Sequence, residues 1–345
     1  MRIAIDGREL RGTPTGVGRF LKGVMDAWDV LPDARRHERI VLTPAAGHGS
    51  TVWEQLTLPR LVRAAGADVL FAPAYSGPLS CPVPMVVAIY DVSFAARPDW
   101  FGWREGTRRR VLTRLAARRA ARVLTTSHFS RKEIADRLRI SSSKIDVVYP
   151  GIPLREPEPP APCGRRAHVV LYVGSLFTRR HIPELIDGFA RAARRRPDIR
   201  LAIVGDNRTT PRIDVEALVR ASGVADRINL RSYVPDEMLA ALYGEARAFV
   251  FLSEYEGFGL TPLEALGAGV PIVVLDTPVA REVYRDAACY VPSPDPSLVA
   301  AAIDRVLGDE AERTRILTAA ARLLPRYSWQ TCAARVLDAL TTAAA

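Results

Sequence analysis

The sequence lacks most features that mark membrane, secreted or metal-binding proteins. No apolar run approaches the length of a membrane span. The four cysteines, Cys81, Cys163, Cys289 and Cys332, are scattered, without a CxxC pair or the spacing of metal ligands. Residues 1–6, MRIAID, are typical of a strand and leave no room for a signal peptide. We therefore expect a reduced, cytoplasmic protein.

Lysine is also nearly absent, since only Lys22, Lys132 and Lys144 accompany 45 arginines. Such an imbalance indicates a coding bias toward arginine rather than selection for a basic patch. The formal net charge of +10 favours anionic partners such as nucleotides, phospholipid surfaces or nucleic acid. The charge alone does not choose among them.

Several motifs of catalysis and cofactor binding are missing. The sequence contains no Asp-x-Asp pair for a sugar-nucleotide metal, no GxxxxGK[ST] phosphate loop, no HExxH and no nucleophile elbow. Aromatic residues that could stack on bases are not interleaved with the basic run, which argues against nucleic acid. We expect neither a metal ion nor a nucleic-acid partner.

Short apolar runs alternate with longer amphipathic stretches throughout the 345 residues, a length that favours two domains. This alternation predicts an α/β fold with parallel sheets. Helices are expected between most of the strands, for example over residues 182–196 and 235–243. The predicted strands cover residues 2–6, 39–43, 68–71, 85–89, 122–126, 145–149, 168–173, 200–204, 227–231, 248–252, 271–275 and 288–291.

A proline-rich segment over residues 150–162 is incompatible with regular structure and divides the chain. We expect a Rossmann-like domain over residues 1–152, a linker over 153–167 and a second Rossmann-like domain over 168–326. A C-terminal helix over 327–345 would pack back across the linker. The carboxyl ends of the two sheets would face each other across a deep cleft, where open α/β folds bind ligands.

Two segments favour an anionic ligand. Residues 15–20, TGVGRF, follow the first strand, and their glycines would let backbone amides approach a phosphate. An ordinary helix start is an equal alternative there. Residues 174–181, GSLFTRRH, end a strand with Arg179 and Arg180 before a helix, an arrangement that fits a diphosphate. The alternative for this second segment is a solvated loop.

Residues 254–271, EYEGFGLTPLEALGAGVP, place Glu256 eight residues before Glu264. The flanking glycines would expose backbone amides beside Glu256, and a carboxylate next to bare amides is a good receptor for sugar hydroxyls. Residues 261–264 have the form of a helix start, with Thr261 as N-cap and Glu264 reaching back to it. Two carboxylates at this spacing also suggest glycoside hydrolysis.

Residues 104–122 contain eight arginines. On a helix, members spaced by four residues would form one ridge beside an apolar strip. One interpretation is a solvated helix face, and the other is peripheral contact with an anionic membrane at its inner face. The residues of this ridge are Arg110, Arg114, Arg118 and Arg122, and the strip contains Val111, Leu112 and Leu115.

Taken in order, these segments resemble the retaining glycosyltransferases of family 4, which have the GT-B fold. Within that family the TGVGRF and DVSF segments are most similar to bacterial mannosyltransferases of polysaccharide assembly. The most specific part of the resemblance is the E-x7-E signature from Glu256 to Glu264. Supporting segments cover residues 15–20, 91–94, 126–130, 147–151, 173–181 and 327–329.

The resemblance implies a site for a nucleoside-diphosphate sugar. Glu256 would bind the sugar hydroxyls, Arg179 and Arg180 the diphosphate, and Glu264 the ribose. Catalysis would depend on Glu256, Arg180 and Asp91, with Asp91 orienting the acceptor. The other implied donor contacts are Gly16, Val17 and Gly18 from the N-terminal, acceptor-binding domain, Gly174 and Ser175 near the diphosphate, Tyr233 and Val234 along the base, and Gly257, Phe258, Gly259 and Leu260 near the sugar.

Two positions depart from the family's usual pattern. Arg180 and His181 stand where lysine followed by asparagine or glycine is common. Tyr90 stands where a histidine often precedes the aspartate, so a contact with the donor sugar would come from the Tyr90 hydroxyl.

The implied reaction is metal-independent transfer of a hexose, with attack on the same face that the diphosphate leaves. The acceptor would be a saccharide, a lipid-linked sugar or a small molecule. GDP-mannose is the first donor hypothesis, and UDP-glucose and UDP-N-acetylglucosamine stay open. Two other hypotheses are a UDP-sugar epimerase, for which no acid–base pair is evident, and a non-catalytic protein that binds sugar nucleotides.

Overall fold

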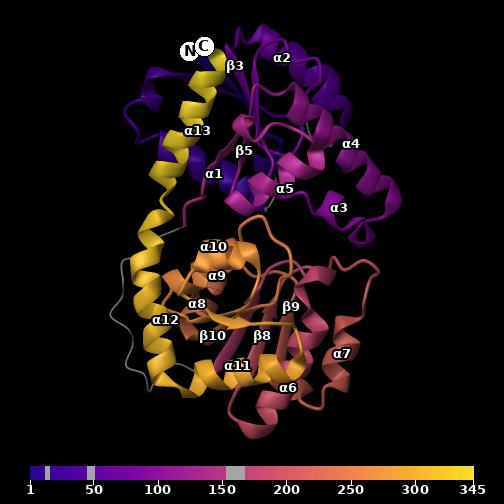
Figure 1. Ribbon diagram of the computed structural model, residues 1–345, viewed down its shortest axis with the longest axis vertical. Coiled ribbons are helices and arrows are strands. Elements are labelled where there is room, and N and C mark those ends of the chain that lie inside the picture. Colours follow the sequence, from indigo (N-terminus) through magenta and orange to yellow (C-terminus); the bar gives the residue numbers. More distant parts are fainter. Residues whose placement is uncertain (12–15, 45–50, 153–167) are drawn as a thin grey trace. The chain divides into compact units, whose positions relative to one another are not determined.

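The computed structural model describes residues 1–11, 16–44, 51–152 and 168–345. These residues divide into two compact units (Figure 1). The first unit contains Met1–Gly151 and Tyr327–Ala345, and the second contains Ile152–Arg326. The predicted linker over residues 153–167 lies outside the described residues.

The first unit is built on a parallel six-stranded sheet in the order β2-β1-β3-β4-β5-β6. Helices connect most of its strands, as expected for parallel pairing. The strands are β1 (Arg2–Asp6), β2 (Glu38–Leu42), β3 (Val69–Ala72), β4 (Met85–Ala88), β5 (Arg122–Thr125) and β6 (Ile145–Val147). The α-helices are α1 (Gly16–Trp28), α2 (Leu58–Ala64), α3 (Ser93–Ala96), α4 (Trp103–Arg119), α5 (His128–Leu138) and α13 (Trp329–Ala344).

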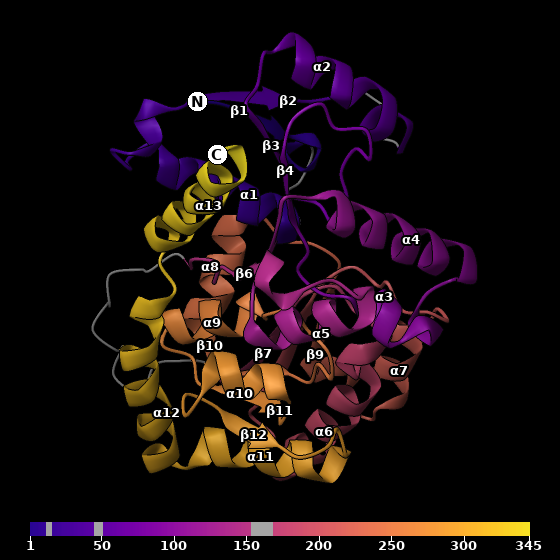
Figure 2. The ribbon, with the colours of Figure 1, turned by 45° about the horizontal axis from the view of Figure 1, so that its top comes forward.

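The second unit has a parallel sheet in the order β12-β11-β10-β7-β8-β9. Its helices α6 and α11 lie side by side, as Figures 1 and 2 both show, and Arg195 of α6 pairs with Asp304 of α11. The strands are β7 (Val169–Val173), β8 (Arg200–Val204), β9 (Ile228–Arg231), β10 (Ala246–Phe251), β11 (Ile272–Leu275) and β12 (Cys289–Val291). The α-helices are α6 (Ile182–Arg195), α7 (Val215–Ala221), α8 (Asp236–Glu245), α9 (Leu260–Gly267), α10 (Pro278–Tyr284), α11 (Pro296–Gly308) and α12 (Glu310–Leu323).

All twelve predicted strands are present, and each observed boundary lies within two residues of the predicted one. The prediction works because every residue of strands such as β3, β4, β7 and β11 is buried. Parallel strands covered on both faces appear in a sequence as short continuous apolar runs. The α/β prediction with two parallel sheets is therefore confirmed.

The predicted arginine ridge is one turn too long. Helix α4 ends at Arg119, and Arg122 is instead the first residue of β5, where its guanidinium pairs with Asp146. The ridge therefore contains only Arg110, Arg114 and Arg118. No helix within the described residues is both long and apolar enough to cross a bilayer.

The C-terminal helix α13 belongs to the first unit and lies beside α1 (Figures 1 and 2). The indole Nε1 of Trp28 in α1 donates to the carbonyl of Ala333 at 2.8 Å. Gly23 makes room for the Trp329 ring, because a Cβ at position 23 would come within 2.6 Å of it. Buried side chains of α13, among them Val336 and Leu340, complete the core on this side of the sheet.

A charged cluster is buried where β1 ends. Asp6 has no exposed surface and Glu54 is 2% exposed, and both carboxylates pair with the guanidinium of Arg8. The Ser76 hydroxyl also donates to Glu54 at 3.0 Å. Burial raises the pKa of Asp6 to about 6, although the Arg8 charge opposes that shift. Arg8 is thus the counter-charge for two carboxylates that water does not reach.

Candidate active site

The second sheet offers a ligand site where its strand order reverses. The chain enters at β7 and continues through β8 and β9 on one side, then through β10, β11 and β12 on the other. Ligands of open α/β sheets bind at such a switch point, outside the carboxyl ends of the strands. Here the loops after β7 and β10 meet, and they carry Arg179, Arg180 and Glu256.

The loop after β7 is shaped around Arg180. Gly174 has a φ of +144°, and a Cβ there would come within 2.7 Å of the Arg180 Nη1. The carbonyl of Ser175 accepts hydrogen bonds from Arg180 Nη1 at 2.9 Å and from the Tyr172 hydroxyl at 3.1 Å. Gly174 and Ser175, both predicted donor contacts, therefore hold the guanidinium in place.

Arg180 and Glu256 form an ion pair. Glu256 Oε1 accepts from Arg180 Nε at 2.8 Å, lies 2.7 Å from Arg180 Nη2 and also accepts from the Ser253 hydroxyl at 2.9 Å. The two charged side chains are 13% and 14% exposed. Burial alone would lower the pKa of Arg180, but the Glu256 carboxylate outweighs burial and raises it. The pair brings together the group predicted to bind the sugar and one predicted to bind the diphosphate.

Arg179 lies next to this pair and is 10% exposed. Its guanidinium carbon is 4.3 Å from the centre of the Phe177 ring, and its Nε is 4.0 Å from Glu256 Oε1. The Arg179 carbonyl accepts from the amide of Glu254 at 3.0 Å, which joins the two loops through their backbones. Two guanidinium groups are thus held at one sheet edge, a disposition that can neutralise a diphosphate.

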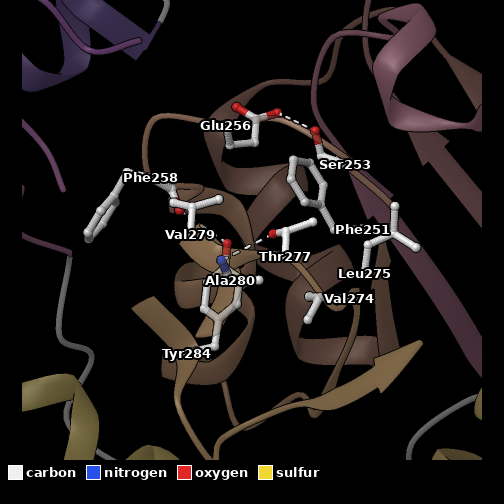
Figure 3. Close-up of a pocket in the computed structure, with 10 residues that line it drawn as sticks. All are labelled: Phe251, Ser253, Glu256, Phe258, Val274, Leu275, Thr277, Val279, Ala280 and Tyr284. Carbon is white, nitrogen blue, oxygen red and sulfur yellow. Dashed lines mark hydrogen bonds between the residues drawn. The ribbon is translucent and has the colours of Figure 1, made fainter. Parts of the chain in front are cut away.

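The glycine loop after Glu256 is held from below by Tyr284. The Tyr284 hydroxyl donates to the carbonyl of Gly259 at 2.9 Å, and Tyr284 is one of the residues that line a small pocket together with Glu256 and Phe258 (Figure 3). Gly259 has a φ of +92°, and a Cβ there would collide with the Tyr284 hydroxyl. Phe258 is 5% exposed and Gly257 is buried. Only glycine fits position 259 without strain.

The helix that carries Glu264 begins two residues earlier than the capping pattern predicts. Helix α9 starts at Leu260 with Gly259 as its N-cap, and no side chain caps it. Thr261 therefore lies inside the first turn, and the predicted capping pair with Glu264 is wrong. The Glu264 carboxylate instead accepts from the Tyr243 hydroxyl of α8 at 3.1 Å.

Tyr233 and Val234, the residues predicted to line the base, follow β9 at the edge of the same sheet. The Tyr233 side chain is 62% exposed, whereas Val234 is 4% exposed. Tyr233 is therefore accessible to a ligand, whereas Val234 is almost wholly buried.

In the first unit, Gly16, Val17 and Gly18 form the first turn of α1. Thr15, just before them, lies outside the described residues. Backbone amides in the first turn of a helix have no partner within the helix, so they point outward and favour an anion.

Tyr90 and Asp91 follow β4 and are fixed by their neighbours. The Tyr90 hydroxyl donates to the Pro73 carbonyl at 2.8 Å, so it holds a loop instead of offering a free O–H to a sugar. Asp91 accepts from the Ser93 amide at 2.8 Å and from the Tyr75 hydroxyl at 3.0 Å. Tyr75 has a φ of +64°, which is uncommon for a residue with a side chain and accumulates at functional sites.

Four residues that support the site were not found from the sequence. Each makes its contact with a residue that is distant in the chain or through a hydroxyl that has no local pattern. A tyrosine near the end of a helix, such as Tyr243 of α8 or Tyr284 of α10, gives no signal of its partner in the sequence. The four are Tyr75, Tyr243, Ser253 and Tyr284.

Comparison with known proteins covers both units. Residues 13–156 match the family described as "Glycosyltransferase Family 4", and residues 164–323 match "Glycosyl transferases group 1". Among curated relatives, the GDP-mannose:cellobiosyl-diphosphopolyprenol alpha-mannosyltransferase of Xanthomonas campestris is 29% identical over 272 residues, 74% of this chain and 67% of that protein. The O-antigen chain mannosyltransferase B of Escherichia coli is 30% identical over 229 residues, 63% of this chain and 59% of that protein.

The similarity to curated relatives is partial in length, since the matches span 67% and 59% of these two proteins and 26% of a third relative, the mannosylfructose-phosphate synthase of Agrobacterium fabrum. Solved structures show the same fold over nearly the whole chain. HepE of Anabaena, in complex with UDP and glucose, is 17% identical with a TM-score of 0.76, and the match covers 99% of this chain and 100% of HepE. The chain belongs to family 4 of the glycosyltransferases and has the GT-B fold.

Proposed function

We propose that this protein transfers a hexose from a nucleoside-diphosphate sugar to an acceptor hydroxyl, with retention of configuration at the anomeric carbon. The observation that carries the proposal is the Arg180–Glu256 pair at the switch point of the second sheet. Charged groups buried in this way at a ligand-binding edge are typical of functional sites.

Each part of the donor has a partner of matching chemistry. Glu256 is held by Ser253 and Arg180, so that its carboxylate is oriented to accept from sugar hydroxyls. Arg179 and Arg180 supply positive charge to the diphosphate. Glu264, steadied by Tyr243, would accept from the ribose.

The reaction breaks the bond between the anomeric carbon and the diphosphate oxygen and forms a bond from that carbon to the acceptor oxygen. The acceptor proton passes to the departing phosphate oxygen on the same face. Negative charge grows on the diphosphate as the bond breaks, and fixed guanidinium groups stabilise that charge more in the transition state than in the bound donor. No metal ion is needed for this neutralisation. Asp91 is our candidate for the residue that orients the acceptor.

GDP-mannose is our first donor hypothesis because both mannosyltransferases described above are relatives, one of them named for GDP-mannose. UDP-sugars are the alternative, since HepE was solved with UDP and glucose. The first test is thermal unfolding of the protein with GDP, UDP, ADP and dTDP, and with CMP as the control. A ligand at a hundredfold excess over its Kd stabilises the folded state by about 2.7 kcal/mol.

A rise in Tm with one diphosphate identifies the base, and turnover of the matching sugar donor with octyl glycosides as acceptors then tests catalysis. The anomeric configuration of the product, read by NMR, tests retention. Binding without turnover for any acceptor would favour a non-catalytic protein. A Tm unchanged by every diphosphate would refute the donor site.

We also propose that the first unit docks on an anionic bilayer through α4. Trp103, Val111 and Leu115 of this helix are 75%, 50% and 40% exposed, and the helix carries seven arginines but a single acidic residue, Glu105. Arg108 reaches Thr51 at 3.3 Å, which places Val52, itself 64% exposed, at the margin of the same surface. Apolar side chains among arginines fit the interface of an anionic membrane.

Co-sedimentation with vesicles tests this docking. Phosphatidylcholine vesicles that contain phosphatidylglycerol should bind the protein, and those without it should bind much less. Replacing Val111 and Leu115 by serine should weaken binding, whereas Leu298→Ser, an exposed leucine of the second unit, should not. Equal binding to both vesicle types, or equal capture by double-stranded DNA, would contradict a membrane surface.

A further inference from the structure

His181 joins the two loops of the donor site. It follows Arg180 directly, forms the N-cap of α6 and has a φ of +50° in the left-handed region. Its side chain is 17% exposed. This conformation is uncommon for a residue with a Cβ, and histidine is among the residues that adopt it most readily.

Both ring nitrogens of His181 face carboxylates. Nε2 lies 3.1 Å from Glu254 Oε2, and Nδ1 lies 3.4 Å from Glu184 Oε1. An ionised carboxylate only accepts hydrogen bonds, and a neutral imidazole carries only one N–H. Both contacts can therefore be favourable at once only when the ring carries both protons and a positive charge.

The contact with Glu254 matters because of where Glu254 is located. It lies two residues before Glu256, and its own amide donates to the carbonyl of Arg179 at 3.0 Å. The loop after β7 and the loop after β10 are thus tied at this point through one backbone bond and one side-chain contact. The Arg180–Glu256 pair lies directly beyond it.

We propose that His181 is a positioning residue for the donor site: its imidazolium ties the two loops through Glu254 and so holds Arg180 and Glu256 in the arrangement that binds the diphosphate sugar. The inference rests on the proposed function. It predicts that a nucleoside diphosphate binds more tightly when His181 is protonated.

The charges around the ring set the sign of the pH dependence. Burial lowers the pKa of His181, but the bonds and charges of Glu184, from α6, and Glu254, from the loop after β10, outweigh burial and raise it. The two residues that precede His181 in the sequence, Arg179 and Arg180, are cations, and Arg180 is paired with Glu256. The contact is present below the raised pKa and is lost as the pH rises through it, so the affinity for the diphosphate should fall in the same range.

The test measures Kd for GDP, and in parallel for UDP, by calorimetry from about pH 5.5 to about pH 8.5, a range that spans the ordinary pKa of histidine. The wild type is compared with His181→Asn, since asparagine tolerates the left-handed conformation but carries no charge. The terminal phosphate of the ligand also titrates near pH 6. The ratio of the two Kd values at each pH removes that effect.

We expect the variant to bind about fivefold more weakly than the wild type at the acidic end, a modest coupling between sites, and nearly equally at the alkaline end. Protonation and binding are linked, so saturating GDP should also raise the pKa of His181 as followed by NMR of its ring. His168→Asn is the matched control. His168 also contacts a carboxylate, that of Asp198 at 3.3 Å, but it directly precedes β7 and so lies at the opposite end of that strand from the donor site. The ratio of the Kd of His168→Asn to that of the wild type should not change with pH.

The outcomes separate this inference from the function that it rests on. A Kd ratio for His181→Asn that is constant across the pH range would overturn the role of His181 while leaving the donor site intact. Failure of the wild type to bind GDP or UDP at any pH would instead refute the donor site. The Tm of each variant without ligand shows whether it is folded.

Discussion

Arg180 and Glu256, 76 residues apart in the chain, meet in an ion pair whose nearest atoms are 2.7 Å apart. One of these groups is proposed to bind the diphosphate of the donor and the other its sugar. The guanidinium that would neutralise the leaving group therefore also orients the carboxylate that would hold the hydroxyls. Substituting either residue should therefore weaken the binding of both the diphosphate and the sugar of the donor.

Replacing Arg180 by alanine should remove donor binding and also lower stability. The change leaves Glu256 largely buried without its guanidinium, and breaking a buried pair on one side costs about 3 kcal/mol. Arg180→Lys should retain part of the affinity, because a lysine keeps the charge but not the planar fork. Calorimetry with GDP and UDP and urea unfolding measure the two effects.

Arg195→Ala is the control for that prediction. Arg195 lies on α6 and pairs with Asp304, but its side chain is 55% exposed. An exposed pair contributes little, so this variant should bind and unfold like the wild type. If Arg195→Ala weakened binding as much as Arg180→Ala, a general effect of positive charge would explain both.

Glu256→Gln should lower kcat/KM by about a hundredfold, comparable to the loss of one preorganised polar group in an active site. The amide keeps the size of the side chain, and its oxygen can still accept from Ser253, so the fold should be retained. Binding of the free diphosphate should change much less than turnover of the sugar donor. Glu216→Gln on the exposed face of α7 is the matched control.

The strands, and the segments that carry the candidate site residues, could be located from the sequence because both depend on local patterns. Fully buried parallel strands such as β7 appear as apolar runs. Two arginines before a helix and a glutamate beside glycines likewise occupy short segments. What could not be predicted is the pairing of Arg180 with Glu256, because the register between two loops depends on the order of strands in the sheet.

The error at Thr261 has a local cause. The sequence Thr-Pro-x-Glu matches a capping pattern, but Gly259 adopts a positive φ that starts the helix earlier. Tyr284 fixes that conformation from a separate helix, by a hydrogen bond to the Gly259 carbonyl. A contact across 25 residues thus outweighed a local propensity, as tertiary contacts often do.

Glu264 should discriminate between ribose and deoxyribose. Its carboxylate is steadied by Tyr243 and is proposed to accept from a ribose hydroxyl. The wild type should therefore bind GDP more tightly than 2′-deoxy-GDP or 3′-deoxy-GDP, by about tenfold for one hydrogen bond to a charged group. In Glu264→Ala the preference should disappear, and in Tyr243→Phe it should shrink. An unchanged preference in Glu264→Ala would exclude the ribose contact.

Arg8 should be essential for the stability of the first unit. Replacing it by methionine leaves Asp6 and Glu54 buried without a counter-charge, a loss of about 3–5 kcal/mol. Arg2→Met, which breaks an exposed pair with Glu38, should cost far less. Urea unfolding at neutral pH measures the difference.

The pH dependence of Arg8→Met gives a second check on the same cluster. The pKa of Asp6 is raised to about 6 even with Arg8 present, and removal of the cation should raise it further. A buried acid with a raised pKa destabilises the folded state once it must ionise. The variant should therefore recover stability, relative to the wild type, as the pH falls from about 8 toward about 5. If Arg8→Met lost the same free energy of unfolding, relative to the wild type, at both pH values, the missing packing of Arg8 and not its charge would be responsible.

Gly259→Ala should test whether the loop conformation serves the donor. The new Cβ would collide with the Tyr284 hydroxyl and impose a φ of +92° on alanine, at a cost of about 1–3 kcal/mol. If the amides around Gly259 bind the sugar, donor affinity should fall together with stability. Gly244→Ala is the control, because a Cβ there meets no atom within 4 Å in helix α8.

The double variant Gly259→Ala with Tyr284→Phe separates the two sources of strain. Removing the hydroxyl relieves the collision but leaves the positive φ, so stability should recover only in part. Calorimetry with the nucleoside-diphosphate sugar then decides the functional question. If stability recovers in part while donor affinity does not, the backbone conformation at Gly259 is itself required for binding. If affinity recovers fully with the collision removed, the loop is a support for Glu256 and its amides do not contact the sugar.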